Sequence, residues 1–281
     1  SEAISKALIP VYNGLMADIS IIIVSYNTAE LTRQCLTSIT ASLKRHPVQA
    51  EVVVVDNAST DNSVSMLESF DSVPLVVVKN TSNLGFGKAN NTGLKKAMGR
   101  YVLFLNSDTV IDNLNFKELL SVMDRDEKIG VLTVRVNLED GGLDPASHRG
   151  FPTLWRSFTY FSKLEQLTRR IPVLKILFGG YHLTHLSLNK THEIESPSGA
   201  FYLTRKSILD SLKGFDEKFF MYGEDLDLSM RIKNLGYKII FYPGQSITHL
   251  KGKSGMRHHD TQVKQGTNKH FYDAMRIFYR K

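Results

Sequence analysis

The chain has 281 residues, of which 42% are hydrophobic and 22% are charged, and this balance excludes a disordered chain. The length suits one large α/β domain or a domain with a tightly attached second half. The formal net charge of +7 favours anionic partners, which are nucleotide phosphates, nucleic acid or an acidic membrane face.

The first half of the chain alternates between strands and helices. Apolar runs predict strands at residues 19–24, 51–55, 74–78 and 101–105. Helical patterns lie between them at residues 29–43, 63–70 and 88–98, and Gly99 ends the last of these. The strands are apolar on both faces, as buried parallel strands are. The order therefore predicts an α/β fold with a doubly wound, mostly parallel sheet.

The second half is less regular and reads as a mixed α/β region. Strands are predicted at residues 130–136, 200–204, 238–242 and 247–250. Helical patterns cover 155–181, which is aromatic and basic, 224–235, which Gly236 closes, and 270–280, which is amphipathic and basic. The stretch before the last helix contains His258 and His259 and predicts either a mobile basic lid over a ligand or a plain solvated loop.

Polar residues follow each of the four apolar strands of the first half. These residues are Ser25-Tyr26-Asn27, Asp56-Asn57-Ala58-Ser59, the stretch from Asn80 to Gly87, and Asn106-Ser107-Asp108-Thr109. Turn formation would explain any one of these loops. It explains less well why two carboxylates directly follow buried strands, because an ionised carboxylate near a core needs a partner. Ligands of open parallel sheets bind at this edge, so a nucleotide and a cation would supply the partners.

The glycines at 85 and 87 do not form a dinucleotide-binding fingerprint, which would have to follow the first strand. The complete phosphate-binding motif Gly-x-x-x-x-Gly-Lys-Ser/Thr is also missing from the sequence. The two glycines can serve a chain reversal before a helix, or the helix that opens there can direct its amides at a phosphate.

The ordered set of motifs resembles the inverting glycosyltransferase family 2 enzymes, and among them the bacterial rhamnosyltransferase-like branch. The matching stretches are 24–27, 55–61, 83–87 with Asn90 and Asn91, 105–109, 198–200, 214–216, 219–227 and His249. The resemblance covers roughly residues 18–255. The resemblance implies a GT-A fold with a Rossmann-like nucleotide-sugar-binding half at 18–130 and a mixed α/β acceptor-binding and catalytic half at 131–255. Residues 256–281 add the basic loop and the amphipathic helix to this one continuous domain.

The resemblance also implies a role for each matching position. The positions that would bind the donor are Ser25, Tyr26, Asn27, Asp56 (at the nucleoside), Asn83, Gly85, Phe86, Gly87, Asn90, Asn106, Ser107 and Asp108. Positions for the acceptor would be Ser198, Gly199, Tyr222 and Trp155. Asp108 stands at the last position of the family's Asp-x-Asp metal motif, and His249 would be a further metal ligand. The first position of that motif is Asn106 here, which removes one charged ligand.

A divalent metal, Mg²⁺ or Mn²⁺, is the expected cofactor. It would neutralise the charge that builds on a departing nucleoside diphosphate. Mg²⁺ is held by one or two protein carboxylates, so the change at Asn106 is tolerable, whereas a histidine ligand favours Mn²⁺. A lone histidine at a strand end is more often simply hydrogen-bonded, so the metal role of His249 follows from the resemblance.

Asp225 is the expected catalytic base, because inversion needs a group that removes the acceptor's proton during attack. Glu224, Asp225 and Asp227 could instead complement the dipole of the helix that they open. We assign that role to Asp227, which can also pair with Arg231 one turn later. For Glu224 both interpretations stay open.

The expected partners are a nucleotide-diphosphate sugar, with dTDP-L-rhamnose favoured by the resemblance, and a glycan or lipid-linked glycan acceptor. The segments 155–161 and 171–178 flank Arg169-Arg170 and suit an anionic membrane surface, although core packing with a solvated basic face explains them equally. The expected location is the cytoplasm, with a candidate peripheral contact on the inner face of the plasma membrane. The single cysteine, Cys35, excludes an intrachain disulfide and lies among apolar residues that predict burial.

Three other functions compete with this interpretation. A sugar-phosphate nucleotidyltransferase would need a Gly-rich, Arg-containing loop after the first strand, which Val24-Ser-Tyr-Asn27 does not provide. A non-catalytic nucleotide-sugar or glycan-binding module would have no need of Asp108, Asp225 and His249 together. Nucleic-acid binding rests on charge alone, and without a recognised motif no nucleic-acid partner is expected.

Overall fold

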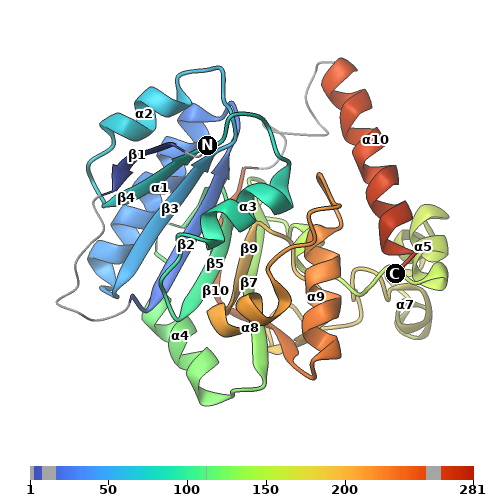
Figure 1. The fold of residues 1–281 in the computed structure, drawn as a ribbon. Coiled ribbons are helices and arrows are strands. Elements are labelled where there is room, and N and C mark those ends of the chain that lie inside the picture. Colours follow the sequence, from blue (N-terminus) through green and yellow to red (C-terminus); the bar gives the residue numbers. More distant parts are fainter. Residues whose placement is uncertain (1–2, 8–16, 112, 251–260) are drawn as a thin grey trace.

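The computed structural model describes residues 3–7, 17–111, 113–250 and 261–281. Its strands are β1 (Ala3–Ala7), β2 (Ile19–Ser25), β3 (Ala50–Asp56), β4 (Leu75–Lys79), β5 (Tyr101–Asn106), β6 (Thr109–Val110), β7 (Ile129–Leu138), β8 (His192–Ile194), β9 (Phe201–Arg205) and β10 (Lys238–His249). They form one sheet in the order β1-β4-β3-β2-β5-β9-β7-β10-β6, with β8 beside β10. Helices cover both faces of this sheet (Figure 1).

Four neighbouring strands, β4, β3, β2 and β5, are parallel, as the sequence predicts. Ser25 pairs with Asp56, and Val24 pairs with Asn106. The polar residues that follow these strands therefore meet at one edge of the sheet. β1 extends the sheet beyond β4 as an antiparallel strand, in a segment that carries no motif in the sequence.

The helices of the first half are α1 (Ala29–Arg45), α2 (Ser63–Ser69), α3 (Phe86–Leu94) and α4 (Phe116–Arg125). Apolar residues of α1 and α4 pack on one face of the sheet, where Cys35 is fully buried as predicted. α3 lies on the other face and comes so close that a side chain on Gly93 would meet Ile22 at 2.6 Å. It begins at Phe86 and ends at Leu94, earlier than the predicted 88–98, and the following residues form turns.

β9 joins the two parts of the sheet, because it pairs antiparallel with both β5 and β7. β10 runs parallel to β7 and ends at His249, which pairs with Thr109 of β6. The sequence predicted two strands where β10 is one. The reason is that Pro243 and Gly244 interrupt the apolar pattern, while the structure absorbs them in a register shift between Tyr242 and Ser246.

The second half contains a 3₁₀ turn and six α-helices: η1 (Pro145–Ser147), α5 (Leu154–Phe161), α6 (Leu164–Thr168), α7 (Pro172–Phe178), α8 (Lys206–Leu212), α9 (Glu224–Asn234) and α10 (Thr261–Phe278). The predicted continuous helix over 155–181 is wrong. Lys163 takes a left-handed conformation with φ of 62°, and Pro172 starts a new helix, so the segment divides into α5, α6 and α7.

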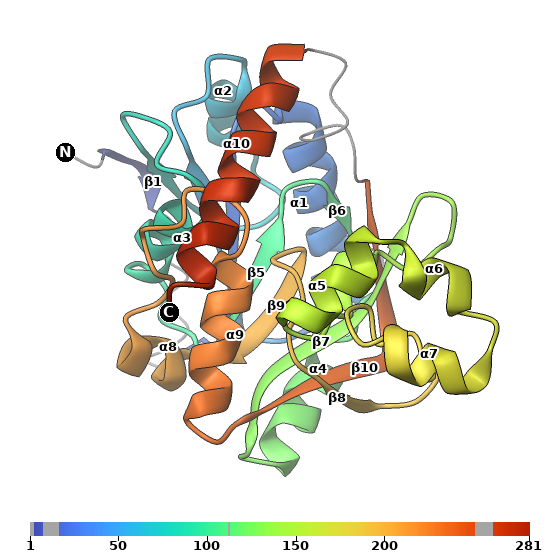
Figure 2. The same ribbon diagram turned by 90° about the vertical axis from the view of Figure 1, so that its right-hand side faces the viewer.

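The last helix packs against the loop that precedes α9. Apolar residues of α10, of this loop and of α9 form a small cluster with Phe219, Leu226, Ala274 and Phe278 at its centre. Figure 2 shows the end of α10 meeting the first turn of α9. α10 starts earlier than the predicted residue 270, and the predicted lid with His258 and His259 lies outside the described residues. Among the helices that the structure describes, none has the length and apolar character needed to cross a membrane.

Candidate active site

Asp56 stands at the carboxyl end of β3 and is only 2% exposed. Its Oδ2 accepts a hydrogen bond from the Ser59 backbone N–H at 3.1 Å. Its Oδ1 is buried and has no hydrogen-bond partner within the described residues. A buried carboxylate oxygen of this kind is costly unless a donor reaches it. Asp56 can therefore receive an N–H or O–H group from a ligand bound at this edge.

Asparagine side chains hold the neighbouring loops in place. Asn57 bonds to Asn80 and Asn83 at 3.0 and 2.9 Å, and Asn83 accepts the N–H of Gly85 at 2.9 Å. Asn27 has φ of 54° and accepts the N–H of Thr60 at 2.7 Å. Asn27 and Asn83, both predicted to bind the donor, thus also shape the loops. The sequence analysis gave Asn57 no role, although it lies inside a quoted motif.

Gly85 serves a close approach between two loops. It has φ of +80°, and a side chain there would lie 2.2 Å from the backbone oxygen of Phe220. The next residue, Phe86, donates its N–H to the same oxygen at 2.8 Å. Of the two interpretations of this glycine, the structure gives direct support to the chain-reversal one.

The other residues predicted to bind the donor nucleotide sugar differ in their exposure to solvent. Ser25 is buried and bonds to the Thr32 hydroxyl at 2.9 Å, and Asn90 donates to the Phe86 carbonyl at 3.0 Å, so both serve the fold. Tyr26 is 45% exposed at the end of β2, where its ring is available to a ligand. Gly87 lies in α3 and faces Phe215, which comes from the loop before α9. Ser107 is buried, and its hydroxyl lies beside that of Thr28.

The predicted metal ligands come together at the ends of β5 and β10. The Nε2 atom of His249 lies 3.1 Å from Asp108 Oδ1 and 3.4 Å from Asn106 Nδ2. Its Nδ1 atom lies 2.8 Å from Oδ2 of Asp144, a residue that the sequence analysis missed. Asp144 is fully buried beside η1, and its pairing with a histidine 105 residues away has no local sequence signal.

These contacts favour the doubly protonated form of His249. Burial opposes the charged imidazolium, but the hydrogen bonds and charges of Asp108 and Asp144 outweigh it and raise the pKa of His249 to about 9. The described residues contain no group of three or more His, Cys, Asp or Glu side chains arranged as a metal site.

The Asp108–His249 pair nevertheless fits a cation that has further ligands. Metal–ligand distances of 2.0–2.1 Å put neighbouring octahedral ligands about 3 Å apart, close to the separation of Asp108 Oδ1 and His249 Nε2. A metal on Nε2 would replace one proton, and Asp144 would still accept the other from Nδ1, as carboxylates do behind metal-bound histidines.

Two acidic residues, Glu224 and Asp225, begin α9 and differ in their hydrogen-bond partners. Asp225 accepts a hydrogen bond at Oδ2 from Nη2 of Arg149 at 2.8 Å, in an ion pair whose side chains are 11% and 12% exposed. Its Oδ1 accepts the N–H of Leu226 at 2.8 Å. Glu224 is buried, and its Oε2 has no partner in the described part of the chain. Burial, with the neighbouring charge of Asp225, raises the pKa of Glu224 to about 8.

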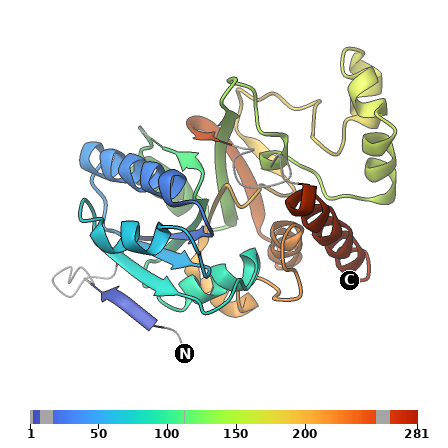
Figure 3. The same cartoon turned by 90° about the horizontal axis from the view of Figure 1, so that it is seen from above.

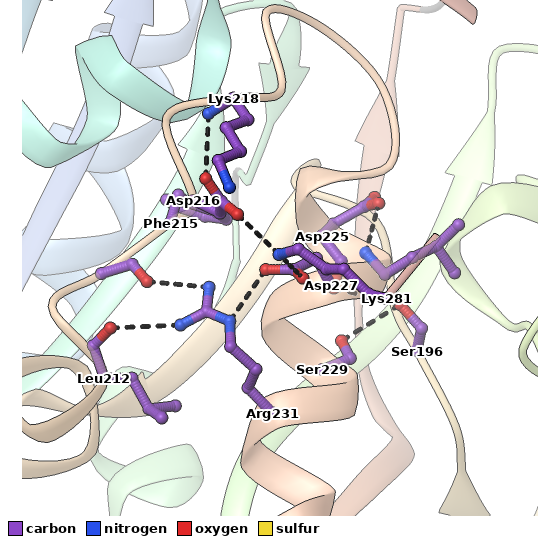
Figure 4. Close-up of polar contacts among 12 residues, drawn as sticks. Ser196, Leu212, Phe215, Asp216, Lys218, Asp225, Asp227, Ser229, Arg231 and Lys281 are labelled. Atoms are coloured by element: carbon purple, nitrogen blue, oxygen red, sulfur yellow. Dashed lines mark hydrogen bonds and ion pairs between the residues drawn. The ribbon is translucent and has the colours of Figure 1, made fainter. Parts of the chain in front are cut away.

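Asp227 belongs to a separate structural network (Figure 4). It pairs with Arg231 at 2.8 Å, as the sequence predicts, and also with Lys281. Lys281 in turn pairs with Asp216 at 2.6 Å. These contacts tie the end of α10 to α9 and the preceding loop, and they leave Asp225 as the charged carboxylate outside this network.

The segment 196–199 lies between the Asp108–His249 pair and Asp225. Arg149 donates from Nη2 to the Pro197 carbonyl at 3.1 Å as well as to Asp225. A side chain on Gly199 would lie 3.8 Å from Oδ1 of Asn106, which in turn approaches His249. The two groups of catalytic candidates are therefore linked through the contacts of this one segment.

The residues predicted to bind the acceptor divide into two groups. Ser198 and Gly199 lie in this connecting segment, and the Ser198 hydroxyl is buried without a partner among the residues described. Tyr222 precedes Glu224, and burial followed by the nearby Glu224 raises its pKa. Trp155 lies on α5, where its indole donates to the Leu177 carbonyl at 3.1 Å.

Arg149 is the most important residue that the sequence analysis missed. A single arginine in Ser-His-Arg-Gly-Phe carries no signal of its partner, because Asp225 is 76 residues away in the chain.

The chain is similar in sequence to proteins of a known family. The family model described as glycosyl transferase family 2 matches residues 20–192. An N-acetylglucosaminyl-diphospho-decaprenol L-rhamnosyltransferase of Mycobacterium tuberculosis is 26% identical over 250 residues, which are 83% of this chain and 76% of that protein.

Solved structures agree on the fold. S. aureus TarS 1-349 in complex with UDP-GlcNAc superposes with a TM-score of 0.60 at 21% identity, over 92% of this chain and 65% of that one. The mannosyltransferase PcManGT from Pyrobaculum calidifontis, in complex with GDP-Man and Mn²⁺, gives 0.56 at 20% identity, over 86% and 59%. The predicted GT-A fold and the rhamnosyltransferase-like resemblance are confirmed, and the chain belongs to glycosyl transferase family 2.

Proposed function

We propose that this glycosyltransferase moves L-rhamnose from dTDP-L-rhamnose to a hydroxyl of a glycan or lipid-linked glycan, with inversion and with the aid of a divalent metal. The observation that carries the proposal is that the segment 196–199 links the Asp108–His249 pair, through Asn106, with Asp225, through Arg149. The mycobacterial relative, named for L-rhamnosyl transfer to a decaprenol-linked diphosphate sugar, supports the choice of donor and acceptor.

In this proposal residues 18–130 hold the nucleotide sugar and residues 131–255 hold the acceptor. The unpartnered Oδ1 of Asp56 would accept a hydrogen bond from the nucleoside. Asp108 and His249 would hold Mg²⁺ or Mn²⁺, which, when bound, neutralises charge on the diphosphate leaving group. Two structural neighbours contain Mn²⁺, which supports this choice.

Asp225 would accept the proton of the attacking hydroxyl. The two carboxyl groups of α9 differ in surroundings, and such a difference separates the roles of paired acids. Burial and the neighbouring Asp225 raise the pKa of Glu224 to about 8, which favours its protonated form at neutral pH, whereas Asp225 pairs with the guanidinium of Arg149. The hydroxyl's O–H bond breaks as the new bond to the sugar carbon forms, and the bond from that carbon to the diphosphate oxygen breaks on the opposite side, which releases the nucleoside diphosphate. The proton goes to Oδ2 of Asp225 once the acceptor displaces Nη2 of Arg149.

The test combines a donor screen with one isosteric variant. Purified protein is incubated with nucleotide sugars and Mg²⁺ or Mn²⁺, and release of nucleoside diphosphate is measured with and without acceptor. Asp225→Asn should lower kcat by about 10²–10⁴-fold, the usual contribution of a positioned base. It should leave the thermal shift caused by the donor unchanged. Near-normal turnover in this variant would refute the assignment of the base.

The same screen separates the competing functions. A non-catalytic module would bind a nucleotide sugar and release no diphosphate with any acceptor. A nucleotidyltransferase would make a nucleotide sugar from a sugar phosphate and a nucleoside triphosphate.

A further inference from the structure

Three short helices expose their apolar side chains to solvent. α5, α6 and α7 lie at the outer edge of the molecule, beyond α9 and α10 (Figures 1 and 3). Sixteen large apolar side chains are exposed in the described part of the chain, and ten of them fall within residues 154–177, so the exposure is concentrated rather than scattered. The ten, which we name the α5–α7 surface, are Leu154, Trp155, Phe158, Tyr160, Phe161, Leu167, Ile171, Val173, Ile176 and Leu177.

The pattern of burial in these helices is the reverse of core packing. The buried residues are Thr159 in α5 and Glu165 and Thr168 in α6, and α7 has none. Leu167 is 79% exposed although its neighbours at 165 and 168 are buried. A helix that covers a core would bury its apolar stripe. Of the two interpretations of this segment, core packing is therefore the one that the structure disfavours.

The exposed charged residues around the α5–α7 surface are basic. Residues 151–180 contain five basic residues and a single acidic residue, Glu165. Glu165 is buried and pairs with His182 at 3.1 Å, so it offers no negative charge to solvent. Lys163, Arg169 and Arg170 are exposed at the ends of α6. An apolar face with a basic border is the pattern of a segment that lies in the interface of an anionic membrane.

We propose that the α5–α7 surface docks on an anionic lipid bilayer. The exposed side chains amount to on the order of 1,000 Å², well above the apolar patch of an ordinary monomer. A second copy of the chain is a less suitable occupant, because a two-fold contact through this surface would bring two basic borders together. Phosphate headgroups supply the opposite charge, and the acyl boundary accepts the aromatic and aliphatic side chains.

Docking would also orient the candidate active site. α5 begins five residues after Arg149, which pairs with Asp225. Arg156 of α5 pairs with Glu195, beside the segment 196–199, and Ser157 bonds to Tyr279 at 2.6 Å. The surface is therefore held by several contacts to the elements that carry the site. This orienting role rests on the proposed function, in which the acceptor is attached to a lipid, whereas the docking itself does not.

The experiment is vesicle flotation of the full chain without donor or acceptor. Vesicles of phosphatidylcholine and phosphatidylglycerol in equal amounts are compared with pure phosphatidylcholine at low and high salt. We expect binding to the anionic vesicles at low salt, and at least a tenfold weaker partition to the neutral ones. Wild-type protein that stays unbound from anionic vesicles at low salt would overturn the proposal.

Two triple variants and a matched control locate the contact. Phe158→Ser with Phe161→Ser and Leu167→Ser should weaken binding at least about tenfold, because each removes apolar area from the interface. Lys163→Glu with Arg169→Glu and Arg170→Glu should weaken it about a hundredfold or more, since each basic residue near an anionic surface contributes about fivefold. The control, with the same charge change on and beside α4, is Lys117→Glu with Arg125→Glu and Lys128→Glu; it should weaken binding less than the α6 triple variant.

Other outcomes are also decisive. Circular dichroism and thermal unfolding verify that each variant is folded. If the apolar variant is folded and binds like the wild type, the surface is wrong. A wild-type dimer that dissociates in the apolar variant, with no vesicle binding by either, would assign the surface to a second copy.

Sugar transfer to a water-soluble acceptor should be equal in wild type and variants. Failure of that reaction in all of them would count against the proposed function and leave the docking result intact.

Discussion

Replacing Arg149 with methionine tests how the candidate base is held. The substitution keeps most of the side-chain volume and removes the guanidinium that contacts Asp225 at 2.8 Å. Both side chains are nearly buried, so the carboxylate would be left in a poorly solvated place without its cation. Breaking a buried ion pair by removing one partner costs about 3–5 kcal/mol. At about 2 °C per kcal/mol for a chain of this size, the melting temperature should fall by about 6–10 °C.

A double-mutant cycle isolates the pair. Asp225→Asn removes the negative charge that Arg149→Met leaves unpaired, so the double variant should be more stable than the sum of the single effects predicts, by about 2 kcal/mol. Arg33→Met is the control, because its pair with Glu30 is exposed and should change stability by less than about 1 kcal/mol. The measurement is urea unfolding followed by circular dichroism. Additive single effects, or an Arg149 variant as mild as the control, would refute the reasoning.

Three further predictions concern single residues. Glu224→Gln should remove one contribution to the pH dependence of stability. Glu224 loses its proton near pH 4.5 in the unfolded wild type and near pH 8 in the folded protein, so its contribution to stability falls as pH rises through this window. A variant with the same slope as the wild type would contradict the raised pKa. Gly85→Ala should destabilise the fold by at least about 1–3 kcal/mol, because the new side chain meets the Phe220 backbone at positive φ, and an unchanged midpoint in urea would oppose this. Asp144→Asn should weaken Mn²⁺ binding about 10–100-fold in calorimetric titration through its contact with His249, and unchanged affinity would deny Asp144 this role.

The parallel strands were predictable from sequence because their apolar residues are continuous and turn residues bound them. α4 was equally accessible and was missed: Asn115 accepts the N–H of Glu118 at 3.1 Å, and this cap precedes an amphipathic pattern. The single strand β10 was not accessible, because only its pairing with β7 carries the chain through Pro243 and Gly244.

The candidate site likewise contains residues that the sequence could indicate and residues that it could not. Motif positions such as Asp56, Asp108 and Asp225 could be named because the order of their surroundings is distinctive. Arg149 and Asp144 could not, because their importance arises from partners that only the folded chain brings near. Sequence patterns therefore named the candidate site residues, and tertiary contacts supplied the partners that hold them in place.

The buried position of Cys35 has a practical consequence. Burial raises the pKa of this thiol to about 12, and the side chain has no exposed surface, so it should not react with maleimide reagents while the protein is folded. The natural sequence is thus a ready background for site-directed labelling. An environment-sensitive fluorophore on Phe161→Cys would report contact with acyl chains directly, and a spin label on Tyr272→Cys would report the position of α10 as substrates bind.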